Sequence, residues 1–274
     1  MNTIFDQMLE RYGDLPEGKL WNAKYEVTQQ IVLAGLHHSG FFNKAAFYGG
    51  TCLRIFHGMR RFSEDMDFTL LQEDPTFHLE DYFQDIIEEF KLIGRDVIIK
   101  KKDKLTLGKV ESAFLKDETD VYNLTFQTEK TIKVKIEIDI KPPLEFQTEY
   151  KKLNHPGTFL VRCMTLPSLY AGKMHALAFR TWKTRVKGRD WYDFEWYVTN
   201  EVPLDYNHLR TRIKEFNGLD LNKEDFLEVL RERLASTDID LVKADVLGFV
   251  EDPHELDIWS NDYFLQLADR IKFV

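Results

Sequence analysis

Along the first half of the chain, the apolar positions have helical spacing in some segments and form strand-like runs in others. Between residues 23 and 40 they return every three or four positions, which predicts a buried helix. The next segments predict a short strand at 45–48, a helix at 51–57, a strand at 62–71 and an amphipathic helix at 76–92. The chain therefore starts with a helix, a strand and a turn, followed by a second helix and a second strand.

Strand-forming segments dominate the next part of the chain. Four runs, at 96–101, 109–114, 122–127 and 131–140, are separated by charged or polar residues, which is typical of one mixed or antiparallel sheet. In the last run the alternation is strict. It places Lys133, Lys135, Glu137 and Asp139 on one face and four aliphatic side chains on the other.

Helical periodicity takes over after a loop region marked by Pro142, Pro143, Pro156 and Gly157. It predicts helices at 168–179, 190–198, 208–216, 223–235, 239–247 and 263–271. We therefore predict an α+β protein with a boundary near residue 160. A lobe with a mixed sheet flanked by helices spans 1–160, and a helical lobe spans 161–274.

Composition excludes several classes of protein. With 274 residues, 43% of them hydrophobic, the chain can bury a large core. The N-terminus does not resemble a signal peptide, and no run of eighteen apolar residues predicts a membrane span, so we expect a cytoplasmic protein. Cys52 and Cys163 are expected to be buried thiols rather than a disulfide or zinc ligands. The net charge of −9 argues against nucleic-acid binding by the whole surface, but it leaves a local basic patch open.

Two carboxylates and a small-residue turn carry the candidate chemistry. Asp65 and Asp67 are two positions apart, so on a strand both point to one face and can hold Mg²⁺. In the Gly49-Gly50-Thr51 turn, backbone N–H groups and the start of the next helix can meet phosphate oxygens, with the Thr51 hydroxyl as a further donor. The chain has no Gly-x-x-x-x-Gly-Lys-Ser/Thr motif, which argues against a P-loop NTPase.

A third carboxylate is expected from a neighbouring strand, because two-metal phosphoryl transfer commonly uses one. Glu137 and Asp139 are the candidates, and alternation alone does not choose between them. Each signal also has an ordinary explanation. A Gly-Gly-Thr segment is usually just a turn, an Asp-x-Asp pair is often a solvated strand edge, and Glu137 can simply face solvent. The order of strand, turn, helix and acid pair favours the catalytic interpretation.

Five segments together resemble one family. They are Gly49-Gly50-Thr51-Cys52-Leu53, the segment from Arg61 to Phe68, Lys135-Ile136-Glu137, the segment from Leu169 to Leu177, and Arg189-Asp190-Trp191-Tyr192-Asp193. They resemble the AbiEii/AbiGii-type toxin nucleotidyltransferases of the polymerase β-like nucleotidyltransferase superfamily. The similarity covers about residues 45–200, and its first and last motifs are the most specific.

The resemblance implies a nucleotidyltransferase lobe and a helical lobe that completes the active-site cleft. It implies that Asp65, Asp67 and Glu137 bind Mg²⁺, and it favours Glu137 over Asp139. It adds Lys173 and Asp190 as catalytic residues of the helical lobe. The residues that it implies for binding the NTP are Gly49, Gly50, Thr51, Ser63, Lys173 and Asp193.

The function implied is that of a toxin in a bacterial toxin-antitoxin or phage-defence system. It would transfer a nucleoside monophosphate from an NTP to an acceptor hydroxyl, with a tRNA 3′ end as the expected acceptor and an antitoxin protein as the expected partner. Two alternatives stay open: a nucleotidyltransferase that modifies a small molecule or a protein, and an inert RNA-binding or partner-binding protein that kept the fold.

Two charged segments complete the sequence picture. The basic segment holds Arg180, Lys183, Arg185, Lys187 and Arg189 around Trp182, and it is either an RNA contact or a solvated loop. The acidic C-terminal segment holds Asp238, Asp240, Glu251, Asp252, Glu255 and Asp257. It can contact an antitoxin, shield the enzyme or keep the lobe soluble.

Overall fold

The chain forms two compact units that are built from interleaved segments. The computed structural model describes residues 3–14, 17–101, 119–126, 132–180 and 186–274. Unit 1 comprises Met1–His57, Glu64–Pro142 and Thr148–Cys163, and unit 2 comprises Gly58–Ser63, Pro143–Gln147 and Met164–Val274. Two short segments from within the predicted first lobe, 58–63 and 143–147, thus belong to the second unit.

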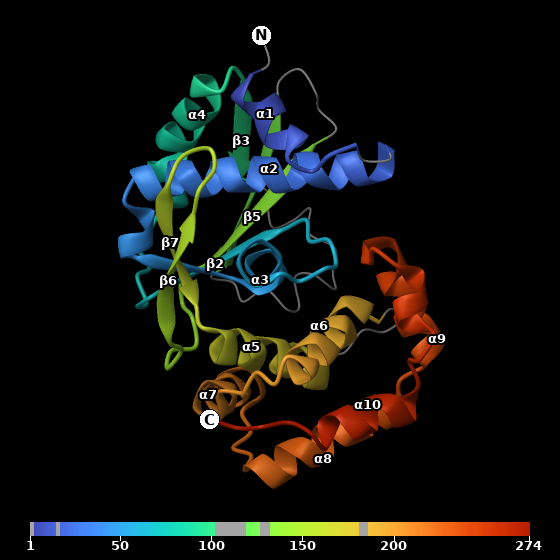
Figure 1. Ribbon diagram of the computed structural model, residues 1–274. Coiled ribbons are helices and arrows are strands. Elements are labelled where there is room, and N and C mark those ends of the chain that lie inside the picture. The colour runs from blue at the N-terminus through green and yellow to red at the C-terminus, as the bar shows by residue number, and fades with distance from the viewer. Residues whose placement is uncertain (1–2, 15–16, 102–118, 127–131, 181–185) are drawn as a thin grey trace. The chain divides into compact units, whose positions relative to one another are not determined.

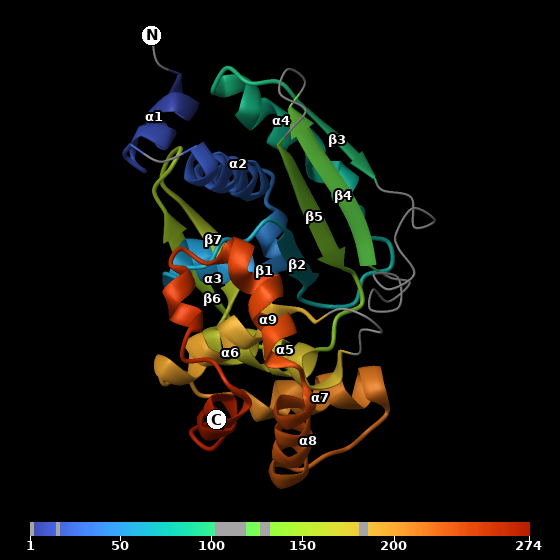
Figure 2. The same cartoon turned by 90° about the vertical axis from the view of Figure 1, so that its right-hand side faces the viewer.

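A mixed sheet is the framework of unit 1 (Figures 1 and 2). Its seven described strands lie in the order β3-β4-β5-β2-β1-β7-β6. Their bounds are β1 Ala45–Tyr48, β2 Met66–Leu70, β3 Val97–Lys101, β4 Thr119–Phe126, β5 Lys133–Asp139, β6 Thr148–Leu153 and β7 Phe159–Met164. β2 runs parallel to β5 and β1 parallel to β7, whereas β1 and β2, β3 and β4, and β4 and β5 are antiparallel. The mixed sheet with helices confirms the predicted α+β class.

Four α-helices are described in unit 1: α1 Ile4–Glu10, α2 Glu17–His38, α3 Gly49–His57 and α4 Phe83–Leu92. Figure 1 shows α2 lying across the sheet, and α2 is in contact with β5 and with α4. Its side chains Val27, Ile31 and Leu33 are fully buried, as its apolar periodicity predicts. α2 also packs closely on α4, because a Cβ at Gly35 would lie only 2.6 Å from the Cα of Ile86.

Most predicted elements of unit 1 are confirmed, with shifted ends. The strand predicted at 62–71 is shorter, since β2 begins at Met66, and the helix predicted at 76–92 consists of a 3-10 turn, Leu79–Tyr82, followed by α4. The loop predicted between Pro143 and about residue 160 is wrong, because β6 and β7 form there. The strand predicted at 109–114 lies outside the described residues.

Unit 2 is helical, and all six helices predicted for it are confirmed. They are α5 Leu166–Phe179, α6 Gly188–Thr199, α7 Tyr206–Asn217, α8 Lys223–Ser236, α9 Ile239–Val246 and α10 Asn261–Ala268. Side chains that accept backbone N–H groups begin four of them, namely Asp205, Asn222, Asp238 and Ser260. α5 and α6 are joined in the core by the stacked rings of Tyr170 and Tyr197, whose centroids are 4.3 Å apart.

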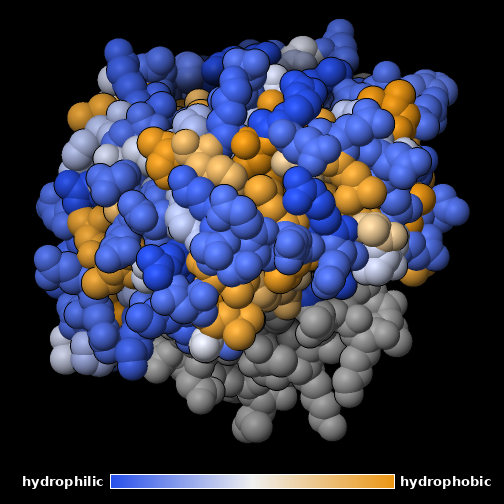
Figure 3. All heavy atoms as spheres, turned by 90° about the horizontal axis from the view of Figure 1, so that it is seen from below, coloured by the Kyte–Doolittle hydropathy of each residue, from blue (hydrophilic) through white to orange (hydrophobic). Residues whose placement is uncertain are grey.

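Exposed apolar side chains are scattered over the surface. In the view of Figure 3 they gather in several groups with hydrophilic side chains between them, and dispersed apolar residues of this kind are normal on protein surfaces. Cys52 and Cys163 are buried free thiols, as predicted. Among the described helices, none has both the length and the apolarity that crossing a membrane requires.

Candidate active site

The glycine turn of unit 1 lies directly against the acid pair. β1 ends at Tyr48, which is paired with Asp67 on β2, and α3 begins at the next residue, Gly49. Gly49 has a φ of 80°, and a Cβ on it would overlap Oδ2 of Asp67 and lie 3.0 Å from Cγ. The helix predicted from Thr51 thus starts two residues earlier, so that both glycines belong to its first turn, where N–H groups have no acceptor within the helix.

Thr51 ties this helix to the acid pair. Its hydroxyl donates a hydrogen bond to the backbone carbonyl of Asp65, and its side chain is fully buried. In the structure this hydroxyl fixes the segment that leads into β2. Its predicted contact with a phosphate stays a prediction.

The strand pairing of β2 identifies the neighbour of the acid pair. Met66 and Phe68 are fully buried, whereas Asp65, which directly precedes β2, and Asp67 are half-buried on the opposite side. In the parallel register of β2 and β5, Asp67 is the partner of Glu137. Residues paired in this way point to the same face of a sheet, so Glu137 is beside Asp67.

Asp139, the other candidate for the third acid, lies farther from the turn. Its partner on β2 is Thr69, two residues beyond Asp67, and its Oδ1 accepts the backbone N–H of Lys141 at 3.1 Å. The register therefore favours Glu137, in agreement with the resemblance, over Asp139.

The donor chemistry of this face suits a hard divalent cation, because its candidate ligands are carboxylate oxygens. Glu137 forms an ion pair with Lys135, two residues away on the same face of β5. Among the described residues, no three His, Cys, Asp or Glu side chains are gathered as a formed metal cluster. Strand register brings Asp67 and Glu137 together, and their carboxylate oxygens are of the kind that Mg²⁺ prefers.

The predicted residues of unit 2 form a buried charge network of their own. Lys173 on α5 lies with its Nζ 2.8 Å from Oδ1 of Asp190 and 2.7 Å from Oδ2 of Asp193, both on α6. Asp190 is also 3.5 Å from Nη1 of Arg180. Burial alone would raise the pKa of Asp190, but Lys173, Arg180 and Lys187 hold it well below its ordinary value. Asp190 is therefore ionised throughout the physiological range.

Arg61 completes this network and is not among the predicted site residues. Its Nε and Nη2 donate to the two carboxylate oxygens of Asp193 at 2.5 and 2.6 Å, and both side chains are at most 2% exposed. Asp193 thus has both oxygens occupied by Arg61 and Lys173, which gives it a positioning role. Its predicted contact with the nucleotide stays a prediction. Arg61 lies four residues before Asp65 in the same motif, and this closeness in sequence was the available signal.

The structure describes Ser63 and part of the basic segment. Ser63 is buried in the short segment of unit 2 that carries Arg61. Of the basic segment, Arg180, Lys187 and Arg189 are described, and the guanidinium of Arg189 lies over the ring of Phe249 at 4.2 Å. Trp182, Lys183 and Arg185 lie outside the described residues.

The acidic C-terminal segment has several local structural roles. Asp238 and Asp252 cap α9 and a 3-10 turn, Pro253–Leu256, by accepting backbone N–H groups. Glu255 lies 3.0 Å from Nη1 of Arg60 and accepts the hydroxyl of Tyr192 at 2.7 Å. These contacts explain three of the six acids without a partner protein.

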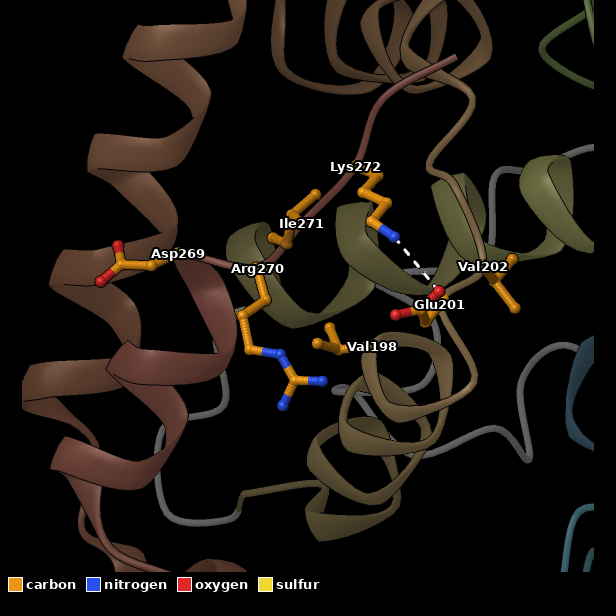
Figure 4. Close-up of a pocket in the computed structure, with 7 residues that line it drawn as sticks. All are labelled: Val198, Glu201, Val202, Asp269, Arg270, Ile271 and Lys272. Atoms are coloured by element: carbon orange, nitrogen blue, oxygen red, sulfur yellow. Dashed lines mark ion pairs between the residues drawn. The ribbon is translucent and has the colours of Figure 1, made fainter.

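A surface pocket of about 350 Å³ in unit 2 does not include the predicted residues (Figure 4). It is lined by Val198, Glu201, Val202, Asp269, Arg270, Ile271 and Lys272. Figure 4 shows Lys272 reaching toward Glu201, with which it forms an ion pair at 3.3 Å. Asp269 at its wall is likewise paired, with Arg231 at 2.9 Å, so we assign the pocket no part in the chemistry.

Replacing Gly49 by alanine is expected to reduce activity about a hundredfold, because the new Cβ displaces the Asp67 carboxylate and a displacement of about 1 Å has an effect of that size. Gly58→Ala is the matched control. Gly58 has a φ of 74° and open space around its Cβ position, so it shares only the backbone strain of about 1 kcal/mol. Initial transfer rates and melting temperatures of both variants check this. Equal activity losses would show that backbone strain, and not contact with Asp67, matters.

The comparisons with known proteins identify the family and the fold. The family model described as "Nucleotidyl transferase AbiEii toxin, Type IV TA system" matches residues 31–267. Among solved structures, JHP933 from Helicobacter pylori is similar over 93% of this chain and 92% of its own, with 17% identity and a TM-score of 0.54. MenT4, a nucleotidyltransferase toxin from Mycobacterium tuberculosis, is similar over 94% and 98%, with 16% identity and a TM-score of 0.51. At these identities both structures show a shared fold. A comparison with curated proteins gave no match.

Proposed function

Because this chain belongs to the AbiEii family of nucleotidyltransferase toxins from type IV toxin-antitoxin systems, we propose that it transfers a nucleoside monophosphate from an NTP to the 3′ end of an RNA, with tRNA as the acceptor. Membership of such a system implies an antitoxin partner. The proposal goes further than the family in naming the acceptor, the metal ion and the residues that act.

One observation carries the proposal: a glycine turn without side chains packs on a carboxylate whose strand neighbour is a second carboxylate. Gly49 approaches Asp67, and Asp67 is paired with Glu137. We propose Asp65, Asp67 and Glu137 as the Mg²⁺ ligands. The bound metal would neutralise phosphate charge and lower the pKa of the attacking hydroxyl.

The chain's own residues would bind and orient the triphosphate. Without side chains at Gly49 and Gly50, the backbone N–H groups of the first turn of α3 can approach phosphate oxygens closely. Thr51 would keep Asp65 beside this turn through its hydrogen bond to the Asp65 carbonyl. These contacts would hold the α-phosphate for in-line attack.

We also propose that Lys173 and Asp190 of unit 2 take part in the transfer. An ammonium group has three donors, and the ion pairs with Asp190 and Asp193 can use two of them. The third can donate to an oxygen of the leaving pyrophosphate. Asp190 would orient the ammonium, since its own charge is kept by the surrounding cations.

The experiment that tests the function is an incorporation assay. Purified protein is mixed with total RNA and each of four labelled NTPs, in MgCl₂ or in EDTA. We expect label in RNA of tRNA size, in MgCl₂ only. The matched control is the same RNA after periodate oxidation, which destroys the 3′ hydroxyls and should prevent labelling. Label in protein or in a small molecule instead would contradict the RNA acceptor. Absence of label in every fraction would contradict nucleotidyl transfer itself.

A further inference from the structure

The backbone that carries Asp65 lies just outside the strand that carries Asp67. β2 begins at Met66, and its described pairs with β1 and β5 include Asp67 and Met66 but not Asp65. A carboxylate that binds a metal ion together with a neighbour needs a fixed orientation. The orientation of Asp65 therefore depends on side chains that hold its segment in place.

Two buried side chains hold this segment by its backbone carbonyls. Thr51 on α3 donates to the carbonyl of Asp65, and Gln29 on α2 donates through Nε2 to the carbonyl of Glu64 at 3.0 Å. Thr51 is fully buried and Gln29 is 1% exposed. All four residues belong to unit 1. Two consecutive peptide groups are thus tied to two different helices.

Gln29 lies among apolar side chains on α2. Val32 and Leu33, which follow it by three and four positions and so share its side of the helix, are fully buried. A primary amide in such surroundings is costly unless it is hydrogen-bonded, whereas an apolar side chain of similar size has no such cost. Packing therefore does not explain a glutamine at this position, and its hydrogen bond to Glu64 does.

The same helix also holds the start of β5. Tyr25 is four residues before Gln29, on the same side of α2, and its hydroxyl accepts the backbone N–H of Lys133 at 3.3 Å. Lys133 is the first residue of β5, the strand that carries Glu137. α2 thus contacts the backbone immediately before β2 and at the beginning of β5, so both acid-bearing strands share one support.

We propose that Gln29 is a positioning residue of the metal site. By holding the Glu64 carbonyl against α2, it fixes the backbone that presents Asp65 to the same cation as Asp67 and Glu137. The proposal rests on the metal-binding role proposed for these three acids, but not on the identity of the nucleotide or of the acceptor. Removal of a group that orients a metal ligand commonly lowers metal affinity by about ten- to a hundredfold.

The test is direct metal binding by the full chain in the absence of nucleotide. Mn²⁺ is the probe, because it suits the same oxygen ligands as Mg²⁺ and its free form is measured by electron paramagnetic resonance. Gln29→Met removes the amide but nearly keeps the volume of the side chain. We expect its dissociation constant for Mn²⁺ to be about tenfold higher than that of the wild type, with a melting temperature within about 3 °C.

Gln30→Met is the matched control, because it makes the same substitution at the next residue of α2. Gln30 is 7% exposed and donates to the hydroxyl of Tyr12 at 3.4 Å, so this variant should bind Mn²⁺ like the wild type. Asp67→Asn, which should abolish the binding, identifies the site that is measured. If Gln29→Met does not fold, Gln29→Asn takes its place. It keeps an amide that is one methylene shorter, and the same rise in the dissociation constant is expected.

Unchanged Mn²⁺ affinity in the folded Gln29 variant would overturn the proposal, and so would an equal loss of affinity in Gln30→Met. Failure of both Gln29 variants to fold would also overturn it, since Gln29 would then serve stability. Mn²⁺ binding by the wild type that does not depend on Asp67 would overturn it together with the proposed ligands. Because binding is measured without turnover, a failed incorporation assay beside the expected Mn²⁺ result contradicts the transfer activity alone.

Discussion

Asp67→Asn is expected to lower the rate of nucleotide transfer by about three orders of magnitude while the protein stays folded. Asparagine keeps the shape that packs against Gly49, but it removes the negative charge that a divalent cation needs. Losing about 4 kcal/mol of transition-state stabilisation by the metal corresponds to roughly a thousandfold in rate. The measurement is the initial rate of label incorporation, with the melting temperature of the variant as the check on folding.

The same assay separates the two candidates for the third acid. Because Glu137 pairs with Asp67 and Asp139 with Thr69, Glu137→Gln should lose activity to a similar extent. Asp139→Asn is the matched control, because Asp139 lies two residues from Glu137 on the same face of β5. This variant should keep most of its activity. A severe loss in Asp139→Asn with an active Glu137→Gln would show that the register does not identify the ligand.

Asp193→Ala is expected to destabilise unit 2 by about 3–5 kcal/mol, the usual effect of leaving a buried charge without its partner. Arg61 is 2% exposed and donates to both oxygens of Asp193, so the substitution leaves its guanidinium buried and unpaired. A loss of this size should lower the melting temperature by on the order of 10 °C. Thermal denaturation followed by circular dichroism measures it.

The chain offers a control with the same geometry at the surface. Arg210 donates to both oxygens of Asp220, at 2.5 and 2.9 Å, but the two side chains are about half exposed. Asp220→Ala should therefore leave the melting temperature nearly unchanged, because solvent screens the exposed pair. The double variant Arg61→Leu/Asp193→Leu should recover much of the lost stability, because it leaves no charge unpaired. If Asp193→Ala and Asp220→Ala had equal effects, burial would not be the reason for the importance of the Arg61 pair.

The spacing of apolar and polar residues predicted those helices and strands whose structure depends mainly on residues close in sequence. The alternation around Glu137 predicted β5, and helical periodicity predicted every helix from α5 to α10. The pattern of apolar residues did not predict β6, Thr148–Leu153. This strand lies at the edge of the sheet, and its side chains are only half-buried or exposed. β7 did carry a signal, since Phe159, Val161 and Cys163 are buried and Leu160 is exposed, but the prolines and glycine nearby favoured a loop.

The candidate site was predictable as a list of residues but not as an arrangement. The acid pair and the glycine turn are close in sequence, so their association follows from one strand, one turn and one helix. The choice of Glu137 over Asp139 depends on the register of two strands far apart in sequence, which alternation does not determine. The Arg61–Asp193 pair joins residues 132 positions apart, and only tertiary packing brings them together.

The interleaving of the two units limits how this protein can be divided. Residues 58–63 lie between two segments of unit 1, yet they carry the counter-ion of Asp193 on α6. A gene fragment that starts at Met164 would encode the helices of unit 2 but omit Arg61, and the inward-facing carboxylate would be left with Lys173 alone. Splitting the chain at any single peptide bond therefore leaves at least one of the two units incomplete.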